Sequence, residues 1–146
     1  FKLPSNTSIN YIKRVMGLPG DKIQMKSGRL FINGSLVVQN NDGFYKHVIQ
    51  NKFEQIYEKK KELLGNGKSF STLNLFNDAT LDNTDVFLVP ENHYFVMGDN
   101  RDNSNDSTKD VGFVPRENFF GRADYIWMTW ECWTCLPSFK KVGRIN

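Results

Sequence analysis

Short apolar runs separated by turn residues limit what this chain can fold into. Asn33-Gly34 is the clearest of these turns, because this dipeptide is the strongest short signal for a β-hairpin. It lies between two largely apolar runs, 29–32 and 35–38, and a third run at 22–25 alternates polar and apolar side chains. We therefore predict a β-meander over residues 22–38 with a structural role only.

The rest of the chain is also predicted to be mostly β. Runs rich in β-branched and aromatic residues predict strands at 11–16, 86–89, 93–97 and 121–130. Residues 1–10 are polar and rich in turn formers, so we predict a loop. Residues 54–64 have a helix-forming composition. A glycine-rich turn at 65–67 and an alternating run at 68–76 are nevertheless typical of a hairpin, so we predict strands there as well.

The length and charge of the chain narrow its function. With 146 residues, of which 39% are hydrophobic, the chain can bury the core of one domain. The net charge of +3 is small and the basic residues are scattered, so nucleic acid is not an expected partner. The only dense run is Lys59-Lys60-Lys61, which a solvated face explains. No window reaches the roughly 18–20 apolar residues that span a bilayer. Because the first residue is Phe, we expect the sequence to begin partway through a longer protein.

Lys13 is the first candidate functional residue, because it lies inside an otherwise apolar run. Alternation along a strand would place Tyr11 and Val15 on the same face as Lys13, with Ile12 and Arg14 on the opposite face. Burial would disfavour the charged ammonium, and a neutral amine can take a proton from a hydroxyl as a general base. Alternatively, Lys13 is an edge-strand lysine that extends its amine to solvent.

A polar loop at 98–107 is the second candidate, with three Asp, three Asn, one Arg and two Ser. The side chains of such residues form hydrogen bonds with the nearby backbone. The composition alone therefore indicates a turn whose polar groups bond one another. A calcium loop is not predicted, because Arg101 occupies a ligand position and no glycine stands at the sixth place. The composition of the loop alone therefore indicates no particular chemistry.

Taken together, these two stretches resemble bacterial type I signal peptidases, the membrane-bound serine proteases that remove signal peptides from exported proteins. The matching motifs are Tyr-Ile-Lys-Arg-Val-x-Gly-Leu-Pro-Gly-Asp at 11–21, Gly-Asp-Asn-Arg-Asp-Asn-Ser-x-Asp-Ser at 98–107, Gly-Phe-Val-Pro at 112–115 and Gly-Arg-Ala at 121–123. The resemblance implies antiparallel sheets that form a signal-peptidase-type catalytic domain. Its core would comprise residues 1–39 and 83–146, with a variable β insertion at about 40–82.

The resemblance also implies roles for Lys13 and for three residues around it. Lys13 would be the general base of a Ser–Lys dyad, and Ser104 would hydrogen-bond its amine and orient it. Tyr11 and Ile12 flank the base and would help to form a shallow apolar pocket for small substrate side chains. Alternatively, Tyr11 and Ile12 simply pack in the core.

Two acidic residues of the polar loop are implied as structural supports. Asp99 would pair with Arg14 and so hold the loop to the strand of the base. Asp106 matches the family pattern, but the arginine that usually pairs with it two residues later is Thr108 here. Lys109 is a candidate substitute, although lysine lacks the planar fork of arginine.

The serine nucleophile of these enzymes lies in a Ser-Met-x-Pro-type motif well upstream of the lysine. Ser5 and Ser8 precede Lys13 closely and lack such neighbours, so we expect the nucleophile to lie outside this chain.

The resemblance further implies signal peptides of preproteins as partners and no cofactor or metal. It implies an anchor in the bacterial inner membrane through an upstream transmembrane segment, with the catalytic domain facing the periplasm. Two alternatives are a self-cleaving repressor-type protease, against which the 98–107 loop argues, and a non-catalytic β-rich peptide-binding module on the same scaffold.

Two features near the C-terminus have open interpretations. Cys132 and Cys135 either form a small surface disulfide or remain two thiols, since a zinc site would need two more ligands. Trp127 and Trp130 have rings that suit a membrane interface. For Trp127 we favour core packing.

Overall fold

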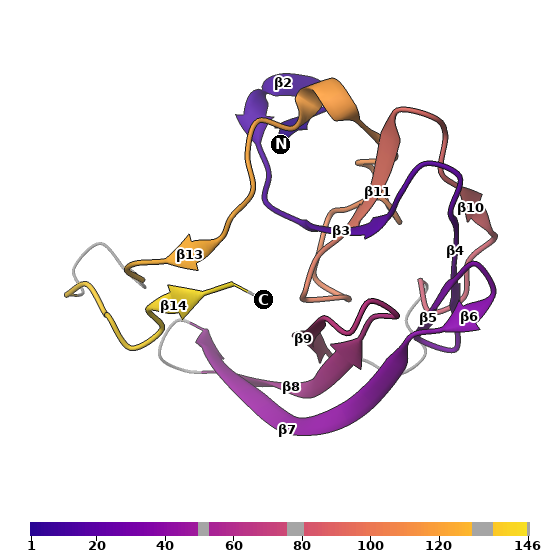
Figure 1. The fold of residues 1–146 in the computed structure, drawn as a ribbon. Helices are drawn as coiled ribbons and strands as arrows, with labels where there is room; N and C mark the ends of the chain where they lie inside the picture. The colour runs from indigo at the N-terminus through magenta and orange to yellow at the C-terminus, as the bar shows by residue number, and fades with distance from the viewer. Residues whose placement is uncertain (50–52, 76–80, 130–135, 146) are drawn as a thin grey trace.

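The computed structural model describes residues 1–49, 53–75, 81–129 and 136–145, and these residues form short antiparallel sheets (Figure 1). The prediction of a mostly β fold is confirmed. No helix in this described part is long and apolar enough to cross a membrane. The elements are β1 (Lys2–Leu3), β2 (Asn6–Asn10), β3 (Arg14–Gly17), β4 (Lys22–Lys26), β5 (Arg29–Ile32), β6 (Ser35–Leu36), β7 (Val38–Ile49), β8 (Phe53–Leu63), β9 (Ser69–Asn74), β10 (Phe87–Leu88), β11 (His93–Met97), β12 (Val114–Pro115), the 3-10 helix η1 (Arg116–Asn118), β13 (Tyr125–Ile126) and β14 (Gly143–Arg144).

A three-stranded sheet with the order β12-β11-β3 positions the candidate site. β11 pairs antiparallel with β3, and Met97 at the end of β11 lies opposite Arg14 at the start of β3. The residues before β3 and the loop after β11 therefore emerge side by side. This pairing brings Lys13 next to the loop 98–107, although the two are far apart in sequence.

The predicted meander is present as a four-stranded sheet with the order β10-β4-β5-β6. Its tight turn has positive φ at both central residues, 53° at Asn33 and 79° at Gly34. A type I′ hairpin turn requires this conformation at both positions. The dipeptide therefore folds as its sequence predicted.

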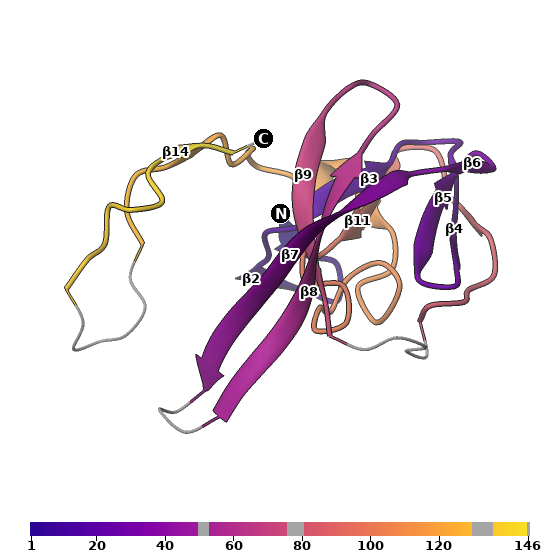
Figure 2. The same cartoon turned by 90° about the horizontal axis from the view of Figure 1, so that it is seen from below.

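The strands β7, β8 and β9 form a third sheet with the order β7-β8-β9, which we call the insertion sheet. Figure 2 shows the long β7–β8 hairpin extending away from the other sheets. The strand prediction for residues 54–64 is confirmed by β8, and the helix suggested by their composition does not form. A register shift between Asn41 and Phe44 marks a bulge in β7, at which Gly43 has a φ of 87°.

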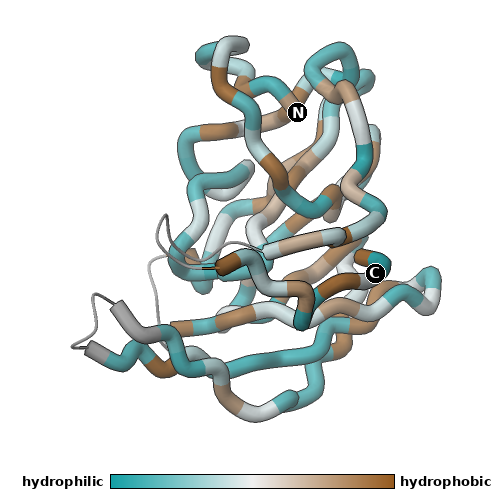
Figure 3. The backbone as a smooth tube through the Cα atoms, turned by 90° about the vertical axis from the view of Figure 1, so that its left-hand side faces the viewer, coloured by the Kyte–Doolittle hydropathy of each residue, from teal (hydrophilic) through white to brown (hydrophobic). Residues whose placement is uncertain are grey.

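The main hydrophobic core lies between these sheets. Hydrophobic and hydrophilic residues alternate over short distances along the backbone (Figure 3), as half-buried strands require. The cluster draws on several sheets and comprises Met16, Ile23, Met25, Leu30, Val37, Phe70, Val89, Phe95 and Met97. Because Phe70 belongs to β9, the insertion sheet shares the core with the strands that carry the candidate site.

The predicted loop at residues 1–10 is wrong, because β1 and β2 pair antiparallel there. All five residues of β2 are exposed, so the strand has no apolar face that could have shown it in the sequence. The buried side chains of this N-terminal segment are those of Phe1 and Leu3. They pack with Val96, Val111 and Val114 in a second hydrophobic cluster.

The predicted long strand at 121–130 is also wrong, since the described strand is only Tyr125–Ile126. It pairs with β14 in a two-stranded sheet that no other described strand joins. Trp127 is 68% exposed, so its predicted core packing is wrong as well. A lone hairpin has no facing layer against which an aromatic run can be buried. Trp130, Cys132 and Cys135 lie outside the described residues.

Candidate active site

Lys13 and Ser104 are in direct contact. The Lys13 Nζ donates a hydrogen bond to the Ser104 Oγ over 2.7 Å, across 91 positions of sequence. Ser104 is buried, whereas Lys13 is half-buried with its Nζ 5.5 Å from the centre of the Tyr11 ring. The amine is thus held by a hydroxyl inside the protein and does not extend freely into solvent. The predicted contact is present.

The close approach of Ser104 depends on Gly98. A Cβ at position 98 would collide with the Ser104 Oγ and would lie 2.5 Å from the Ser104 Cβ. Only glycine therefore leaves room for the serine side chain beneath the start of the loop. The Gly98 amide is fixed in turn, because it donates a 2.8 Å hydrogen bond to the Asp106 Oδ2.

Asp106 is the most deeply buried of the acidic residues in the 98–107 loop, with 1% of its surface exposed. Its other oxygen, Oδ1, accepts hydrogen bonds from the Thr108 amide at 3.0 Å and from the Thr108 Oγ1 at 2.7 Å. Lys109 does not replace the arginine of the family pattern, because its amine lies 3.3 Å from the Asp102 carbonyl oxygen and, among the described residues, forms no ion pair with Asp106. Sequence reasoning missed Thr108, although a threonine two residues after an aspartate is a common local hydrogen-bond partner.

Arg14 and Asp99 form the predicted pair in a two-pronged geometry. The Arg14 Nε lies 2.9 Å from the Asp99 Oδ1, and the Nη2 lies 3.0 Å from the Oδ2. Their side chains are 22% and 50% exposed, so solvent screens the pair and its contribution to stability is small. The Arg14 guanidinium also lies over the Phe70 ring, 4.0 Å from its centre. The pair therefore orients the loop against β3 and does not form a buried salt bridge.

Tyr11 and Ile12 lie just before β3, because the strand begins at Arg14 and not at residue 11 as predicted. Ile12 is 74% exposed, which excludes core packing for this residue. Tyr11 is half-buried, and its ring meets the Phe1 ring edge-on at 6.2 Å. The predicted alternation fails because residues 11–13 precede the strand, and Val15 within the strand is 38% exposed.

Ser104 is the serine that bonds the Lys13 amine within the described part of the chain. Ser5 and Ser8 are exposed residues near the N-terminus, and no contact with Lys13 is found for either in this part of the chain. No three His, Cys, Asp or Glu side chains among the described residues gather closely enough to hold a metal ion. Chemically, the arrangement is a lysine amine oriented by a buried hydroxyl, beside an exposed apolar residue.

Proteins of known family are similar to this chain over most of its length. Signal peptidase I of Rickettsia canadensis is 43% identical over 135 residues, which cover 88% of this chain and 49% of that protein. Signal peptidase I of Rickettsia conorii is 43% identical over 136 residues, with the same shares. The chain thus spans about half the length of the curated relatives it matches.

A solved structure is also similar to this chain. The crystal structure of a signal peptidase I from Enterococcus faecalis is 27% identical, with a TM-score of 0.45, and the match covers 81% of this chain and 85% of that one. Residues 1–130 match the protein family described as "Signal peptidase, peptidase S26". This match includes both motifs that meet at Lys13 and Ser104. The resemblance seen in the sequence is therefore confirmed, and the chain belongs to the signal peptidase family.

Proposed function

We propose that this chain is the part of a signal peptidase I that carries the general base of its Ser–Lys dyad, and that the whole protein removes signal peptides from exported preproteins. The observation that carries this proposal is the 2.7 Å hydrogen bond between the Lys13 amine and the buried Ser104 hydroxyl. Membership of the family and relatives that are named signal peptidase I support it.

In this proposal, a neutral Lys13 amine removes the proton from a serine hydroxyl supplied from outside these 146 residues. The serine oxygen attacks the carbonyl carbon at the cleavage site, and the protonated lysine then gives its proton to the departing amine. Water activated by the same lysine hydrolyses the resulting acyl-enzyme. The Ser104 Oγ accepts a hydrogen bond from Nζ and so orients the amine, but it forms no bond with the substrate.

Tyr11 and Ile12 are proposed to contact the signal peptide. Ile12 presents an apolar side chain to solvent directly beside the base, which suits a shallow pocket for small side chains. The family further suggests an anchor in the bacterial inner membrane, with the catalytic domain on the periplasmic side. The structural supports in this proposal are Arg14, Asp99 and Asp106, which keep the 98–107 loop against β3.

The division of the chain into a core, 1–39 and 83–146, and an insertion at about 40–82 is also proposed. The insertion sheet begins at Val38 and its last strand ends at Asn74, so its strands coincide closely with the segment that lacks family motifs. Its three strands pair with one another in sequence order, as expected of a unit inserted at one point of a fold.

The test uses the full-length protein in a preprotein cleavage assay. Lys13→Ala is expected to abolish cleavage while circular dichroism and thermal unfolding stay unchanged, because the side chain is only half-buried. Lys46→Ala, on the exposed β7–β8 hairpin, is the control and should cleave normally. Cleavage by the Lys13→Ala variant would refute the proposal. A wild-type protein that binds the signal peptide and never cleaves it would identify the non-catalytic peptide-binding module.

A further inference from the structure

Glu62 of β8 is a buried carboxylate that the proposed function does not use. Its side chain is fully buried, and its Oε2 lies 2.6 Å from the Nη2 of Arg101 in the 98–107 loop. Its Oε1 accepts hydrogen bonds from the Gln39 Nε2 at 2.9 Å and from the Thr72 Oγ1 at 3.4 Å. Gln39, Thr72 and Glu62 all belong to the insertion sheet, so this sheet holds a charge that faces the candidate active-site loop.

Within the described part of the chain, Glu62 is the carboxylate that pairs with Arg101. Its side chain is 7% exposed, and its Nε and Nη1 are buried without a hydrogen-bond partner among the described residues. A guanidinium does not lose its proton in proteins, so it cannot respond to the loss of Glu62 by becoming neutral. Without Glu62, the loop must move to bring Arg101 into contact with water. Arg101 precedes Ser104 by only three residues, so such a movement reaches the hydroxyl that orients the base.

Hydrogen bonds of the backbone also join the 98–107 loop to β9 and to the residue that follows it. The Leu73 amide donates to the Asp99 carbonyl oxygen at 2.8 Å, and the Arg101 amide donates to the Leu73 carbonyl oxygen at 2.9 Å. The Leu75 amide donates to the Asp102 Oδ2 at 2.6 Å. The loop therefore lies along the edge of β9 as a short parallel bridge, with Leu73 opposite Asn100. Residues 99–102 are therefore attached to β9 and to Leu75 just after it, and Ser104 lies two residues beyond Asp102.

The insertion sheet also contacts β3, the strand that begins one residue after Lys13. Phe70 of β9 is buried, and its ring lies beneath the Arg14 guanidinium, one residue after Lys13. In Figure 1, β8 and β9 lie on the side of the molecule toward which the loop after β11 descends. The sheet thus supports both partners of the Lys13–Ser104 contact.

We propose that Glu62 is a positioning residue for Lys13, because it holds Arg101 and so fixes the loop that presents Ser104 to the amine. The inference rests on the proposed function of Lys13 and extends the active site into the insertion sheet. It assigns Glu62 no contact with substrate. Loss of Glu62 should therefore affect turnover, and substrate binding beside Ile12 should remain unchanged.

The experiment is a double-mutant cycle on the full-length protein with a purified preprotein as substrate. Glu62→Gln keeps the shape of the side chain and removes its charge. Its kcat should fall by roughly 10- to 100-fold with KM unchanged, as expected when a reacting group is misplaced by about 1 Å. If Glu62 acts through Ser104, the variant that combines Glu62→Gln with Ser104→Ala should be no slower than the slower of the two single variants.

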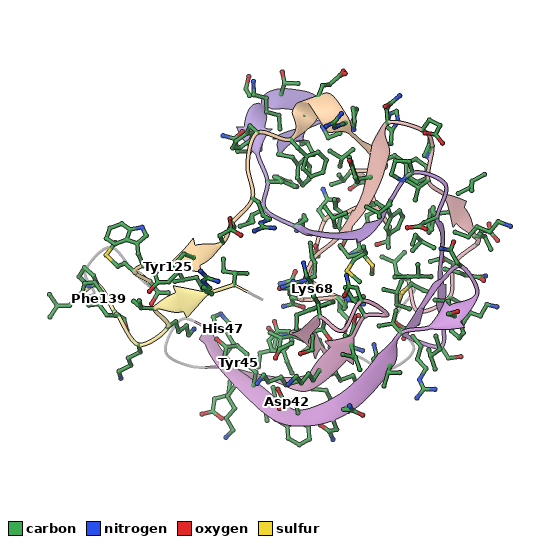
Figure 4. All side chains as sticks on the ribbon, viewed as in Figure 1. Asp42, Tyr45, His47, Lys68, Tyr125 and Phe139 are labelled. Atoms are coloured by element: carbon green, nitrogen blue, oxygen red, sulfur yellow. The ribbon has the colours of Figure 1, made fainter. Side chains whose placement is uncertain are left out.

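The control is Glu54→Gln in the exposed Lys46–Glu54 pair, which lies on the same hairpin. Figure 4 shows Tyr45 and His47, the neighbours of Lys46, on the half of β7 away from β3. This variant should retain wild-type kcat and KM. All rates are expressed per folded molecule, with the folded fraction taken from thermal unfolding at the assay temperature, so that a loss of stability does not appear as a loss of turnover.

Two results would overturn the inference. One is an unchanged kcat for Glu62→Gln, and the other is a double variant whose loss equals the product of the two single losses. If Lys13→Ala is inactive in the same assay, the proposed function survives either result. If Lys13→Ala cleaves, the proposed function itself fails. Should Glu62→Gln not fold, Glu62→Asp takes its place in the cycle, because the shorter side chain withdraws the carboxylate from the Arg101 guanidinium and keeps the charge, and the same absence of additivity is expected.

Discussion

Gly98 and Ser104 share a space that holds only one side chain. A Cβ on Gly98 would lie 2.5 Å from the Ser104 Cβ and would collide with the serine oxygen that bonds Lys13. The hydrogen bond between Lys13 and Ser104 is therefore possible only because residue 98 has no side chain.

Gly98→Ala should displace Ser104 from the Lys13 amine. We expect kcat to fall by roughly 100-fold, because a shift of about 1 Å in a positioning group has this effect. Overpacking of the loop should also cost about 1–3 kcal/mol of stability, measured by denaturant unfolding. Gly65→Ala is the matched control, since a Cβ there meets no atom within 4 Å. Normal turnover in Gly98→Ala would show that Ser104 can move without consequence.

Ser104→Ala should slow preprotein cleavage without abolishing it. The alanine removes the hydroxyl that orients the Lys13 amine, but the amine itself remains. We expect kcat to fall by roughly 10- to 100-fold with little change in KM, measured by steady-state kinetics on the full-length protein. Ser35→Ala, at an exposed position of β6, should have no effect. Identical kinetics for Ser104→Ala and wild type would reduce the loop to a structural role.

Thr108→Val should destabilise the loop through Asp106. The substitution removes a 2.7 Å hydrogen bond to a buried carboxylate, and bonds to charged groups contribute about 1.5–3 kcal/mol. Lys109→Ala should change the free energy of unfolding by less than about 0.5 kcal/mol, as is usual for exposed positions. Both values come from chemical denaturation. A larger effect for Lys109→Ala than for Thr108→Val would contradict the assignment of Thr108 as the partner of Asp106.

Ile12→Ala should raise KM for the preprotein while kcat and thermal stability stay near wild type. The side chain is 74% exposed, so its truncation removes little packing. A loss of apolar contact with the substrate acts equally on the ground state and the transition state. Val86→Ala, at a position that is 52% exposed, serves as the control. An unchanged KM would remove Ile12 from the proposed substrate contacts.

Local sequence signals predicted those parts of the fold that depend on neighbouring residues. Asn33-Gly34 forms its turn because two consecutive residues with positive φ satisfy a type I′ hairpin by themselves. The contact between Lys13 and Ser104 is different, because it joins residues 91 positions apart. No periodicity specifies such a contact, and it could be anticipated only from motifs that resemble a known family.

The failures have physical causes that a single sequence does not reveal. Alternation misled the prediction for Tyr11, which precedes β3 and is not in a strand, and for Val15, which lies in β3 but is 38% exposed. Glu62 stands next to a run of lysines that is typical of a solvated face, yet it is fully buried. Its burial depends on Arg101, which a different sheet delivers. Trp127 stays exposed because no other described strand joins the two-stranded sheet beside it.

The bulge in β7 has a consequence for behaviour in concentrated solution. β7 is an outer strand of the insertion sheet and pairs only with β8 among the described residues, so its other side carries unpaired backbone groups. The irregular register between Asn41 and Phe44 interrupts this row, and the charged Lys46 follows it. Irregular and charged edges resist intermolecular strand pairing. Removal of Gly43 should therefore straighten β7 and increase self-association through this hairpin.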